Sequence, residues 1–202
     1  MNAVLTPIHC AGLDYGIRCP AACVLPYSES DELTPFDQCH FYYITEVKSQ
    51  AIDRGNIHGF HLTGYSAATR YSSIADYFVG VFKEHNVQQI GLEGYAYNAK
   101  GNSQTALAEN VGLLKYLLHQ NGIAYNVHPP TTLKKYSTGK GNASKDDMLA
   151  TFEVITGVDL NGYFGRAKAA LSKSPVSDLV DAYMIANFQR MIRHLEEVPD
   201  DR

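Results

Sequence analysis

The last long segment of the chain, from Ser177 to about Glu197, contains neither proline nor glycine and therefore predicts a long helix. At a helical period Asp181 points the same way as the apolar residues of this segment, and Asp178 lies near the edge of the same stripe. The stripe comprises Met184, Ile185, Phe188, Ile192 and Leu195, while Asn187, Arg190, His194 and Glu197 fall on the other side. A helix that aims carboxylates at a core needs an explanation, because an unpaired buried carboxylate is strongly destabilising.

Capping of the helix is the simpler explanation for these two acids. Ser177 is a good N-cap, and acids in a first helical turn interact favourably with the helix macrodipole. Capping suits Asp178 better than Asp181, because Asp181 faces the core. The alternative is that both carboxylates have a cation as partner.

The size of the chain predicts a single domain spanning residues 1–202, with a core large enough to be stable without disulfide bonds or a structural metal. Its composition is ordinary for a soluble protein, with 45% hydrophobic and 19% charged residues. No apolar run approaches the length of a membrane span, and the N-terminus lacks the pattern of a signal peptide. We therefore expect a cytoplasmic protein without a membrane partner.

The first fifth of the chain holds all of its cysteines, which are Cys10, Cys19, Cys23 and Cys39. Cys19 and Cys23, together with Cys39 and His40, could be drawn as a zinc site, but the spacing is unusual for one. Buried thiols in strands are the favoured interpretation, in keeping with a reducing compartment.

The net charge of −4 does not advertise nucleic-acid binding, but the basic residues are unevenly distributed. Residues 129–145 hold four lysines and no acid until Asp146, namely Lys134, Lys135, Lys140 and Lys145. Residues 161–177 hold Arg166, Lys168 and Lys173, again without an acid. Such runs are most often solvated surface, yet they also allow a local phosphate-binding surface.

Strand and helix patterns follow one another along the chain. Strands are expected twice within 8–27, with a turn near Cys19 and Pro20, and again at 41–47, 88–95 and 123–130. Helices are expected at 67–85, 103–121, 145–156 and in the final segment, with a short helical turn at 131–137. Segments 28–40 and 158–176 read as irregular, and Ser144 with Asp147 resembles a capping box. This order predicts an α/β fold with a five-stranded mixed sheet covered by helices on both faces.

Two of the expected strands share a pattern in which Gly-Leu precedes an acid. Gly12-Leu13-Asp14 and Gly91-Leu92-Glu93 each place the carboxylate on the face of a glycine. Small residues beside a buried acid leave room for something to approach. Alternatively, the glycines serve only the turns that follow.

If these two strands are neighbours and the last helix packs across their ends, four carboxylates converge: those of Asp14, Glu93, Asp178 and Asp181. Hard oxygen ligands without histidine or thiolate suit Mg²⁺ or Mn²⁺. A carboxylate cluster that holds two such ions is the arrangement used for in-line phosphodiester hydrolysis.

The motifs at these positions resemble the RuvC family of Holliday junction resolvases, which has the RNase H-like fold. The resemblance covers most of residues 8–190, and the phage-encoded branch looks closer than the bacterial one. It rests on "GLDYG" (12–16), "IGLEGYAY" (90–97), "PPTTLKKYSTGKGNASKDDM" (129–148) and "SDLVDAYMIA" (177–186). Any of these motifs alone is weak, whereas all four at these spacings form a strong signal.

The resemblance implies a crossover junction endodeoxyribonuclease of DNA recombination and repair, which uses two Mg²⁺ or Mn²⁺ ions in each active site. By this resemblance the four carboxylates are the metal ligands, and Lys145, with Lys140, contacts phosphate near the scissile bond. The other DNA contacts that it implies are Lys134, Lys135 and an aromatic residue that stacks on a junction base, for which Tyr95 and Tyr97 both offer themselves. A homodimer would suit a junction, because its resolution needs two symmetric nicks.

Some features depart from the family, and other functions remain open. The segments 28–40, 48–66 and 158–176 are longer than those expected of bacterial relatives. One alternative is an RNA-processing nuclease of the YqgF type, which the strand glutamate and the Asp-x-x-Asp-Ala helix disfavour. A non-catalytic nucleic-acid-binding module would be expected to have lost a carboxylate, and an actin-like ATPase would need a second phosphate-binding domain.

Overall fold

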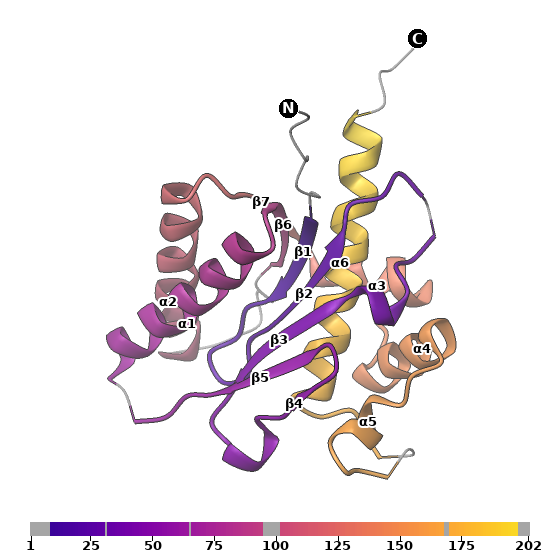
Figure 1. The fold of residues 1–202 in the computed structure, drawn as a ribbon, viewed down its shortest axis with the longest axis horizontal. Helices are drawn as coiled ribbons and strands as arrows, with labels where there is room; N and C mark the ends of the chain where they lie inside the picture. Colours follow the sequence, from indigo (N-terminus) through magenta and orange to yellow (C-terminus); the bar gives the residue numbers. More distant parts are fainter. Residues whose placement is uncertain (1–8, 31, 65, 95–101, 168–169, 198–202) are drawn as a thin grey trace, which may run out of the picture.

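The computed structural model describes residues 9–30, 32–64, 66–94, 102–167 and 170–197. They form three layers, in which a mixed sheet is sandwiched between helices (Figure 1). The strands are β1 His9–Asp14, β2 Ala21–Pro26, β3 His40–Thr45, β4 Asp53–Arg54, β5 Ile57–His61, β6 Val87–Glu93 and β7 Ala124–His128. The helices are α1 Ala67–Glu84, α2 Asn102–Gln120, α3 Pro130–Thr138, α4 Lys145–Thr156, α5 Leu160–Tyr163 and α6 Val176–Glu197, with 3-10 turns η1 Phe36–Gln38 and η2 Lys48–Gln50.

The sheet has the strand order β4-β5-β3-β2-β1-β6-β7. Its centre combines an antiparallel meander, β1 to β3, with the parallel strands β1, β6 and β7. The prediction of a mixed sheet with helices on both faces is confirmed, but the predicted number of five strands is wrong. The structure has seven strands, because the segment 48–66 adds β4 and β5 at one edge.

The added strand β5 runs parallel to β3, and its register explains one of its glycines. Gly59 lies opposite Tyr43, and a Cβ atom at Gly59 would stand 2.3 Å from the Tyr43 Oη. That hydroxyl in turn donates to the Gln50 carbonyl and accepts the Ile52 N–H at 3.0 Å. Tyr43 of β3 therefore attaches the segment 48–66 to the sheet.

One face of the sheet is covered by α1 and α2, whose apolar side chains share a core with the strands. Ile74, Phe78 and Phe82 of α1 and Leu114 and Leu118 of α2 are completely buried there. The Tyr15 hydroxyl, at the end of β1, donates to Asn110 Oδ1 of α2 at 3.1 Å. This face holds the sheet but contributes no carboxylate to the site.

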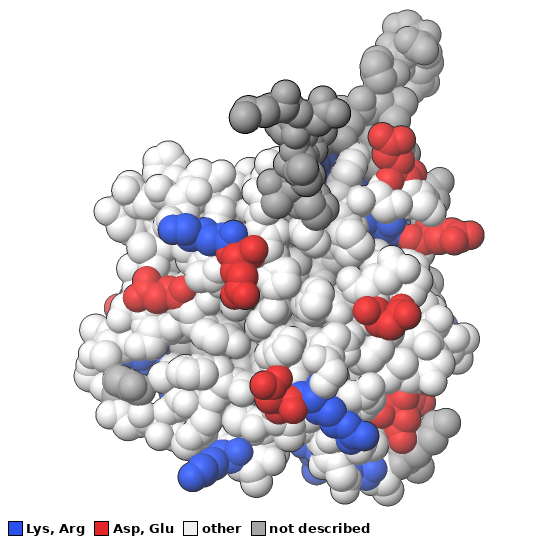
Figure 2. Space-filling view, in the orientation of Figure 1, with Lys and Arg blue, Asp and Glu red and all other residues white. Residues whose placement is uncertain are grey.

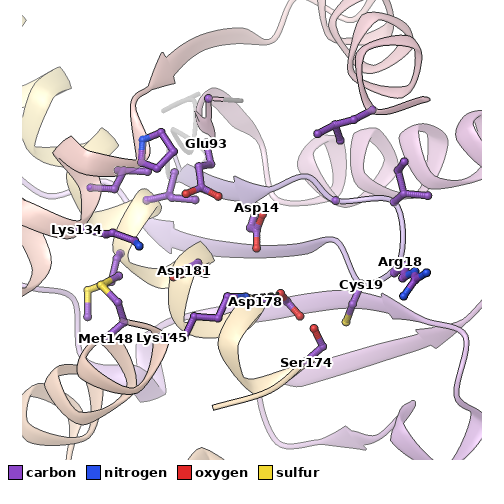
Figure 3. A pocket seen from close by; sticks show the side chains of 18 residues that line it. Asp14, Arg18, Cys19, Glu93, Lys134, Lys145, Met148, Ser174, Asp178 and Asp181 are labelled. Carbon is purple, nitrogen blue, oxygen red and sulfur yellow. Dashed lines mark ion pairs between the residues drawn. The ribbon is translucent and has the colours of Figure 1, made fainter. Parts of the chain in front are cut away.

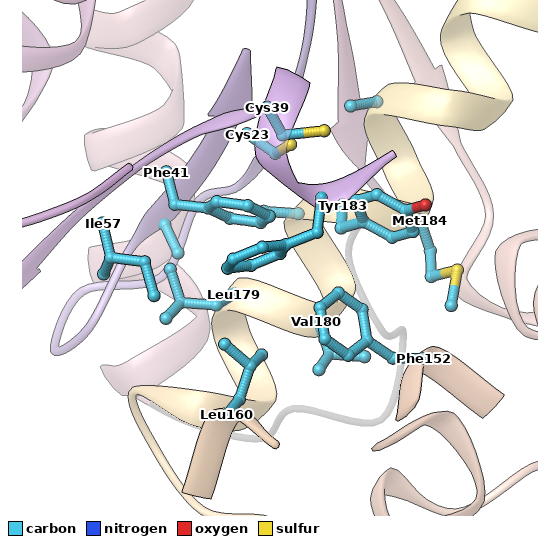
Figure 4. Packing of buried hydrophobic residues seen from close by; sticks show 14 of the residues in the cluster. Cys23, Cys39, Phe41, Ile57, Phe152, Leu160, Leu179, Val180, Tyr183 and Met184 are labelled. Atoms are coloured by element: carbon cyan, nitrogen blue, oxygen red, sulfur yellow. The ribbon is translucent and has the colours of Figure 1, made fainter. Parts of the chain in front are cut away.

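The other face is covered by α6, with α4 and α5 packed outside it (Figure 4). Tyr183 of α6 lies between the strands and Phe152 of α4, with ring centroids 5.2 Å apart. Cys23 and Cys39 lie in the same core as free, fully buried thiols, whereas the His40 side chain is exposed. The predicted buried thiols are thereby confirmed for this pair.

The side of α6 opposite Asp181 is not a solvent face, because the segment 28–40 packs over it. Asn187 Oδ1 accepts the Thr34 N–H at 2.8 Å, and the Tyr183 hydroxyl donates to the Thr34 carbonyl at 2.8 Å. Arg190, which is also buried, donates to the Glu32 carbonyl. The stretch that reads as a polar loop thus supplies backbone partners for the polar residues of a buried helix.

Most of the expected element boundaries hold to within a few residues. The capping box of α4 is present, with Ser144 and Asp147 bonding reciprocally, and Gly157 ends the helix in the left-handed conformation. Segment 158–176 is not wholly irregular, because it contains the single turn α5, where the Asp159 side chain accepts the Gly162 N–H at 3.0 Å. Among the helices that the structure describes, none is long and apolar enough to cross a lipid bilayer.

Candidate functional site

Asp14 and Glu93 end two neighbouring strands of the sheet. Asp14 is the last residue of β1 and Glu93 the last of β6, and these strands are paired in parallel. The pairing sets Gly12 opposite Gly91, followed by the two leucines, so the acids follow in the same register. The carboxyl ends of parallel strands meet at one edge, which is where α/β proteins commonly build their sites.

The glycines that precede these acids are required by the packing of α6 rather than by the turns. A Cβ atom at Gly12 would lie 2.1 Å from the Ala186 backbone nitrogen and 2.4 Å from the Ala182 carbonyl oxygen. A Cβ atom at Gly91 would lie 2.8 Å from Ile185 Cγ2. The helix backbone therefore rests directly on the strands, and this close contact carries its first turns, with Asp178 and Asp181, to the strand ends.

The four predicted carboxylates line one pocket of about 580 Å³, together with Lys134 of α3 and Lys145 of α4. Figure 3 shows Asp14, Glu93 and Asp178 turned into this space from β1, β6 and α6, with Lys145 reaching in beside Asp178. The convergence that the sequence predicts is thus present: strand ends and helix start meet at one hollow. The parallel pairing of β1 and β6 bridges the 79 positions between Asp14 and Glu93, and the packing of α6 bridges the 85 positions between Glu93 and Asp178.

Lys145 is tied to the first turn of α6. Its Nζ lies 3.2 Å from Ser177 Oγ and 3.8 Å from Asp178 Oδ1. The Ser177 hydroxyl also donates to Asp178 Oδ1, at 3.4 Å. The helix begins at Val176, one residue before the predicted start, so Ser177 lies inside it, and its side chain faces the site instead of capping the helix.

Three carboxyl groups of the pocket, those of Asp14, Glu93 and Asp181, have raised pKa values. Burial, then repulsion by Glu93 and the two α6 carboxylates, raises the pKa of Asp14 well above its usual value. Burial and the charge of Glu93 raise the pKa of Asp181 to about 7, and burial also raises the pKa of Glu93. Burial would lower the pKa of Lys145, but the surrounding carboxylates, Asp178 first, raise it above normal.

A divalent cation fits this donor set. Asp178 is only 7% exposed, yet its Oδ2 atom is buried and has no hydrogen-bond partner among the residues that the structure describes. The donors are carboxylate oxygens from three elements, which are the ligands that Mg²⁺ and Mn²⁺ prefer. Within the described parts of the chain, however, no three His, Cys, Asp or Glu side chains already stand close enough together to hold a metal ion.

The predicted DNA contacts divide into two groups. Lys134 and Lys145 line the pocket, whereas Lys135 and Lys140 are exposed and do not line it. Lys140 follows Gly139, which ends α3 in the left-handed conformation with a φ of 77°. Tyr95 and Tyr97 lie outside the described residues, so the structure does not place either of them.

The pocket also contains residues that the sequence analysis did not assign to it. Arg18 and Cys19 follow the β1 motif and line the pocket opposite Lys134, and Ser174 closes it near α6 (Figure 3). Arg166, from the second basic run, donates to the carbonyls of Lys173 and Ser174 at 3.1 and 2.7 Å. Part of that run therefore fastens the approach to α6, whereas Lys168 lies outside the described residues.

No family model matches the chain, but its sequence is similar to that of a known protein. A crossover junction endodeoxyribonuclease RuvC from Brachyspira hyodysenteriae is 27% identical over 128 residues, which are 62% of this chain and 78% of that protein.

Solved structures agree with this match at the level of the fold. Thermus thermophilus RuvC matches with a TM-score of 0.61 and 16% identity over 93% of this chain and 96% of that one. The same protein bound to a Holliday junction gives 0.63 with 15% identity over the same shares, 93% and 96%. The yeast mitochondrial Holliday junction resolvase gives 0.51 with 13% identity over 96% and 83%. The resemblance that the motifs indicated is confirmed for the RuvC family as a whole: the chain is similar to a RuvC protein in sequence and has the RNase H-like fold of RuvC, while the closer likeness to the phage-encoded branch stays a prediction.

Proposed function

We propose that this chain is a metal-dependent, structure-selective endonuclease that resolves Holliday junctions or other branched DNA by phosphodiester hydrolysis. The observation that carries the proposal is the pocket in which the strand-end acids, the α6 acids and two lysines meet. Its similarity to RuvC, in motif order and in fold, supports the same reaction.

Asp14, Glu93, Asp178 and Asp181 would hold the metal, in our proposal two Mg²⁺ or Mn²⁺ ions. Bound there, the metal would supply a hydroxide nucleophile and stabilise the charge on the leaving oxygen. The raised pKa values of Asp14 and Asp181 support this assignment, because a cation would relieve the mutual repulsion that contributes to them.

The lysines have separate roles in this proposal. Lys145 lies 3.8 Å from Asp178 and beside the acids, so its ammonium would stabilise charge that develops on the scissile phosphate. Lys134 lines the same pocket and would hold the adjoining phosphate. Lys135 and Lys140, which are exposed, would contact the DNA backbone further from the reacting bond.

The distribution of charge supports a local DNA contact instead of a wholly basic protein. On the face seen in Figure 2, acidic and basic side chains are interspersed among uncharged ones. With a net charge of −4, attraction to DNA would come from the lysines of α3, α4 and the loop between them. We further propose a homodimer, because a four-way junction is resolved by two symmetric cuts.

The proposal is tested by offering the purified protein three labelled substrates, with and without Mg²⁺: a four-way junction, a linear duplex of matched sequence and an RNA–DNA hybrid. We expect Mg²⁺-dependent paired nicking of the junction and little cleavage of the duplex. Preferential cleavage of the hybrid would instead favour an RNA-directed nuclease. Tight junction binding without cleavage in either Mg²⁺ or Mn²⁺ would indicate a non-catalytic module.

A further inference from the structure

Cys19 differs from the other cysteines of the chain in its surroundings. Cys10, Cys23 and Cys39 are completely buried in the core, whereas Cys19 is only partly buried and lines the carboxylate pocket. Figure 3 shows its sulfur on the same side of the pocket as Asp178, and burial, then the charges of Asp178 and Asp14, raise the pKa of the thiol. A sulfur atom therefore stands at the edge of a site whose other candidate ligands are oxygens.

The backbone on both sides of Cys19 is fixed. The Ile17 carbonyl accepts two hydrogen bonds from the Arg70 guanidinium, at 3.2 and 2.8 Å, and Arg70 is itself paired with Glu46 at 3.0 Å. On the other side, the Pro20 carbonyl accepts the Ile44 N–H at 3.0 Å. The turn between β1 and β2 is thus anchored to α1 and β3, which holds Cys19 at the pocket.

Asp178 provides the second, independent sign of a ligand at this position. The residue is 7% exposed, and within the described part of the chain its buried Oδ2 atom has no hydrogen-bond partner. A buried carboxylate oxygen without a donor is costly unless a cation or a donor completes it. The thiol of Cys19 and this carboxylate line the same space, on the side of the pocket away from Lys134 (Figure 3).

We propose that Cys19 Sγ is an additional ligand for thiophilic divalent cations such as Zn²⁺ and Cd²⁺, which it binds together with Asp178. The inference rests on the metal-binding role of the carboxylates in the proposed function. On binding, the S–H bond breaks, a sulfur–metal bond forms and the proton passes to solvent. Mg²⁺ prefers hard oxygen ligands and gains little from sulfur, so Cys19 makes the site selective among metals and sensitive to soft ions.

The test is a titration of the metal-free protein with CdCl₂, followed by the ultraviolet charge-transfer absorption of a cadmium–thiolate bond. The wild type should show this band, and Cys19→Ser should lose it. Cd²⁺ affinity should fall by at least the roughly 10–100-fold that loss of an outer-shell partner costs. Cys23→Ala, which removes a thiol from the core, is the matched control and should keep the band. Thermal melting of each variant verifies that it is folded.

A second variant separates the two ligands. Asp178→Asn should weaken Cd²⁺ binding but keep the band at saturating metal, because the sulfur is still present. An unchanged band in Cys19→Ser, or no band in the wild type, overturns the inference. If the band is missing while the wild type still cleaves junctions with Mg²⁺, the inference fails and the proposed function stands. If the band is present but no branched DNA is cleaved, the proposed function fails and the cation site remains.

Discussion

Side chains of one kind lie close together at each end of β1. The two clusters limit the repulsion between like charges in different ways. At its start, His9 lies among three other histidines, from β3, β5 and the end of α1, which are His40, His58 and His85. At its end, Asp14 lies among the carboxylates of Glu93, Asp178 and Asp181. One strand of six residues thus separates a cluster of potential cations from a cluster of potential anions.

His40 and His85 of this cluster limit the repulsion between like charges by favouring the neutral form. The rings of His40 and His85 lie 5.0 Å apart between centroids, and His85 Nε2 lies 2.6 Å from the Tyr42 hydroxyl. Burial and then the neighbouring histidines lower the pKa of both rings, although Glu84 opposes this at His85. Neutral imidazoles at pH 7 can pack and hydrogen-bond without any added ion.

The carboxylate cluster cannot become fully neutral at pH 7. An ordinary carboxyl group is ionised well below pH 7, and even the raised pKa of Asp181, about 7, leaves the cluster partly charged there. Lys145, at 3.8 Å from Asp178, offsets one charge. We therefore expect the end of β1 at Asp14 to be the functional end, because like charges remain there that a bound cation would offset.

The largest expected effect comes from changing one carboxylate while leaving the histidines intact. Asp14→Asn should reduce single-turnover cleavage of a four-way junction by about a thousandfold or more, since several kcal/mol of metal-assisted stabilisation are lost. Junction binding, measured by fluorescence anisotropy, should change little because the lysines remain. His85→Asn, at the other end of β1, is the control and should cleave normally. Near-wild-type cleavage by Asp14→Asn would remove the distinction between the two clusters.

The next effect separates a metal ligand from a helix cap. Asp178→Ser keeps a residue that suits a first helical turn, so a capping role alone would leave cleavage almost unchanged. If Asp178 holds the metal through its unpaired Oδ2, cleavage should fall by about a hundredfold or more, as when a directly stabilising group is removed. Single-turnover rates at saturating Mg²⁺ decide between these roles, and full activity would return Asp178 to capping.

A smaller effect is expected from two lysines of the basic segment, Lys140 in the loop between α3 and α4 and Lys145 at the start of α4. Lys140→Ala should weaken binding to all DNA forms similarly and make the salt dependence shallower by about one unit, because one phosphate contact is lost. Lys145→Ala, close to the acids, should act more on the cleavage rate than on affinity. Binding isotherms at several salt concentrations, together with single-turnover cleavage, measure both effects. Unchanged slopes and unchanged rates would show that this loop does not touch DNA.

The smallest effect concerns the histidine end. Because the pKa values of His40 and His85 are lowered in the folded protein, the unfolded chain binds more protons below about pH 6.5, and stability should fall as the pH falls through that value. His85→Asn should reduce this acid loss, by less than about 1 kcal/mol because both rings are partly exposed. Urea unfolding at pH 5 and pH 7.5 measures how steeply the free energy of unfolding of each protein changes with pH. An identical pH slope in both proteins would mean that the cluster carries no such penalty.

Much of this site could be predicted from the sequence because its parts are local patterns. The Gly-Leu-acid motifs end β1 and β6, and the uninterrupted final segment gives α6 with its acids at the start. Their convergence follows once the strands pair in parallel and the helix rests on Gly12 and Gly91. The motifs themselves need only strand alternation and helical periodicity, whereas the strand pairing and the helix packing are seen in the structure.

The remainder depends on contacts between distant segments. β5 is a short strand between β4 and β3 whose register is set by β3, so no local pattern reveals it. The sequence pattern places Asn187 and Arg190 on the outer side of a helix, but both are buried, where the Thr34 N–H donates to Asn187 and the Glu32 carbonyl accepts from Arg190. Cys19 enters the pocket only through the anchored shape of a turn. Side-chain type alone could not place any of these residues.

The central claim is that the carboxylates of the pocket are held together for a cation, and thermal unfolding between pH 5 and pH 8 tests it most directly. Because the pKa of Asp181 is raised to about 7, the folded protein binds more protons than the unfolded chain between about pH 4 and pH 7. Stability without metal should therefore be lost as the pH rises through this window, by on the order of a few kcal/mol.

At pH 8, Mg²⁺ should raise the melting temperature of the wild type in proportion to the logarithm of its concentration once the site is saturated. Asp181→Asn should melt higher than the wild type without metal, because a buried charge is removed, and should gain much less from Mg²⁺. We expect this pattern if the carboxylates of the pocket bind a cation. A wild-type protein whose stability neither declines with pH relative to Asp181→Asn nor responds to Mg²⁺ or Mn²⁺ would contradict it.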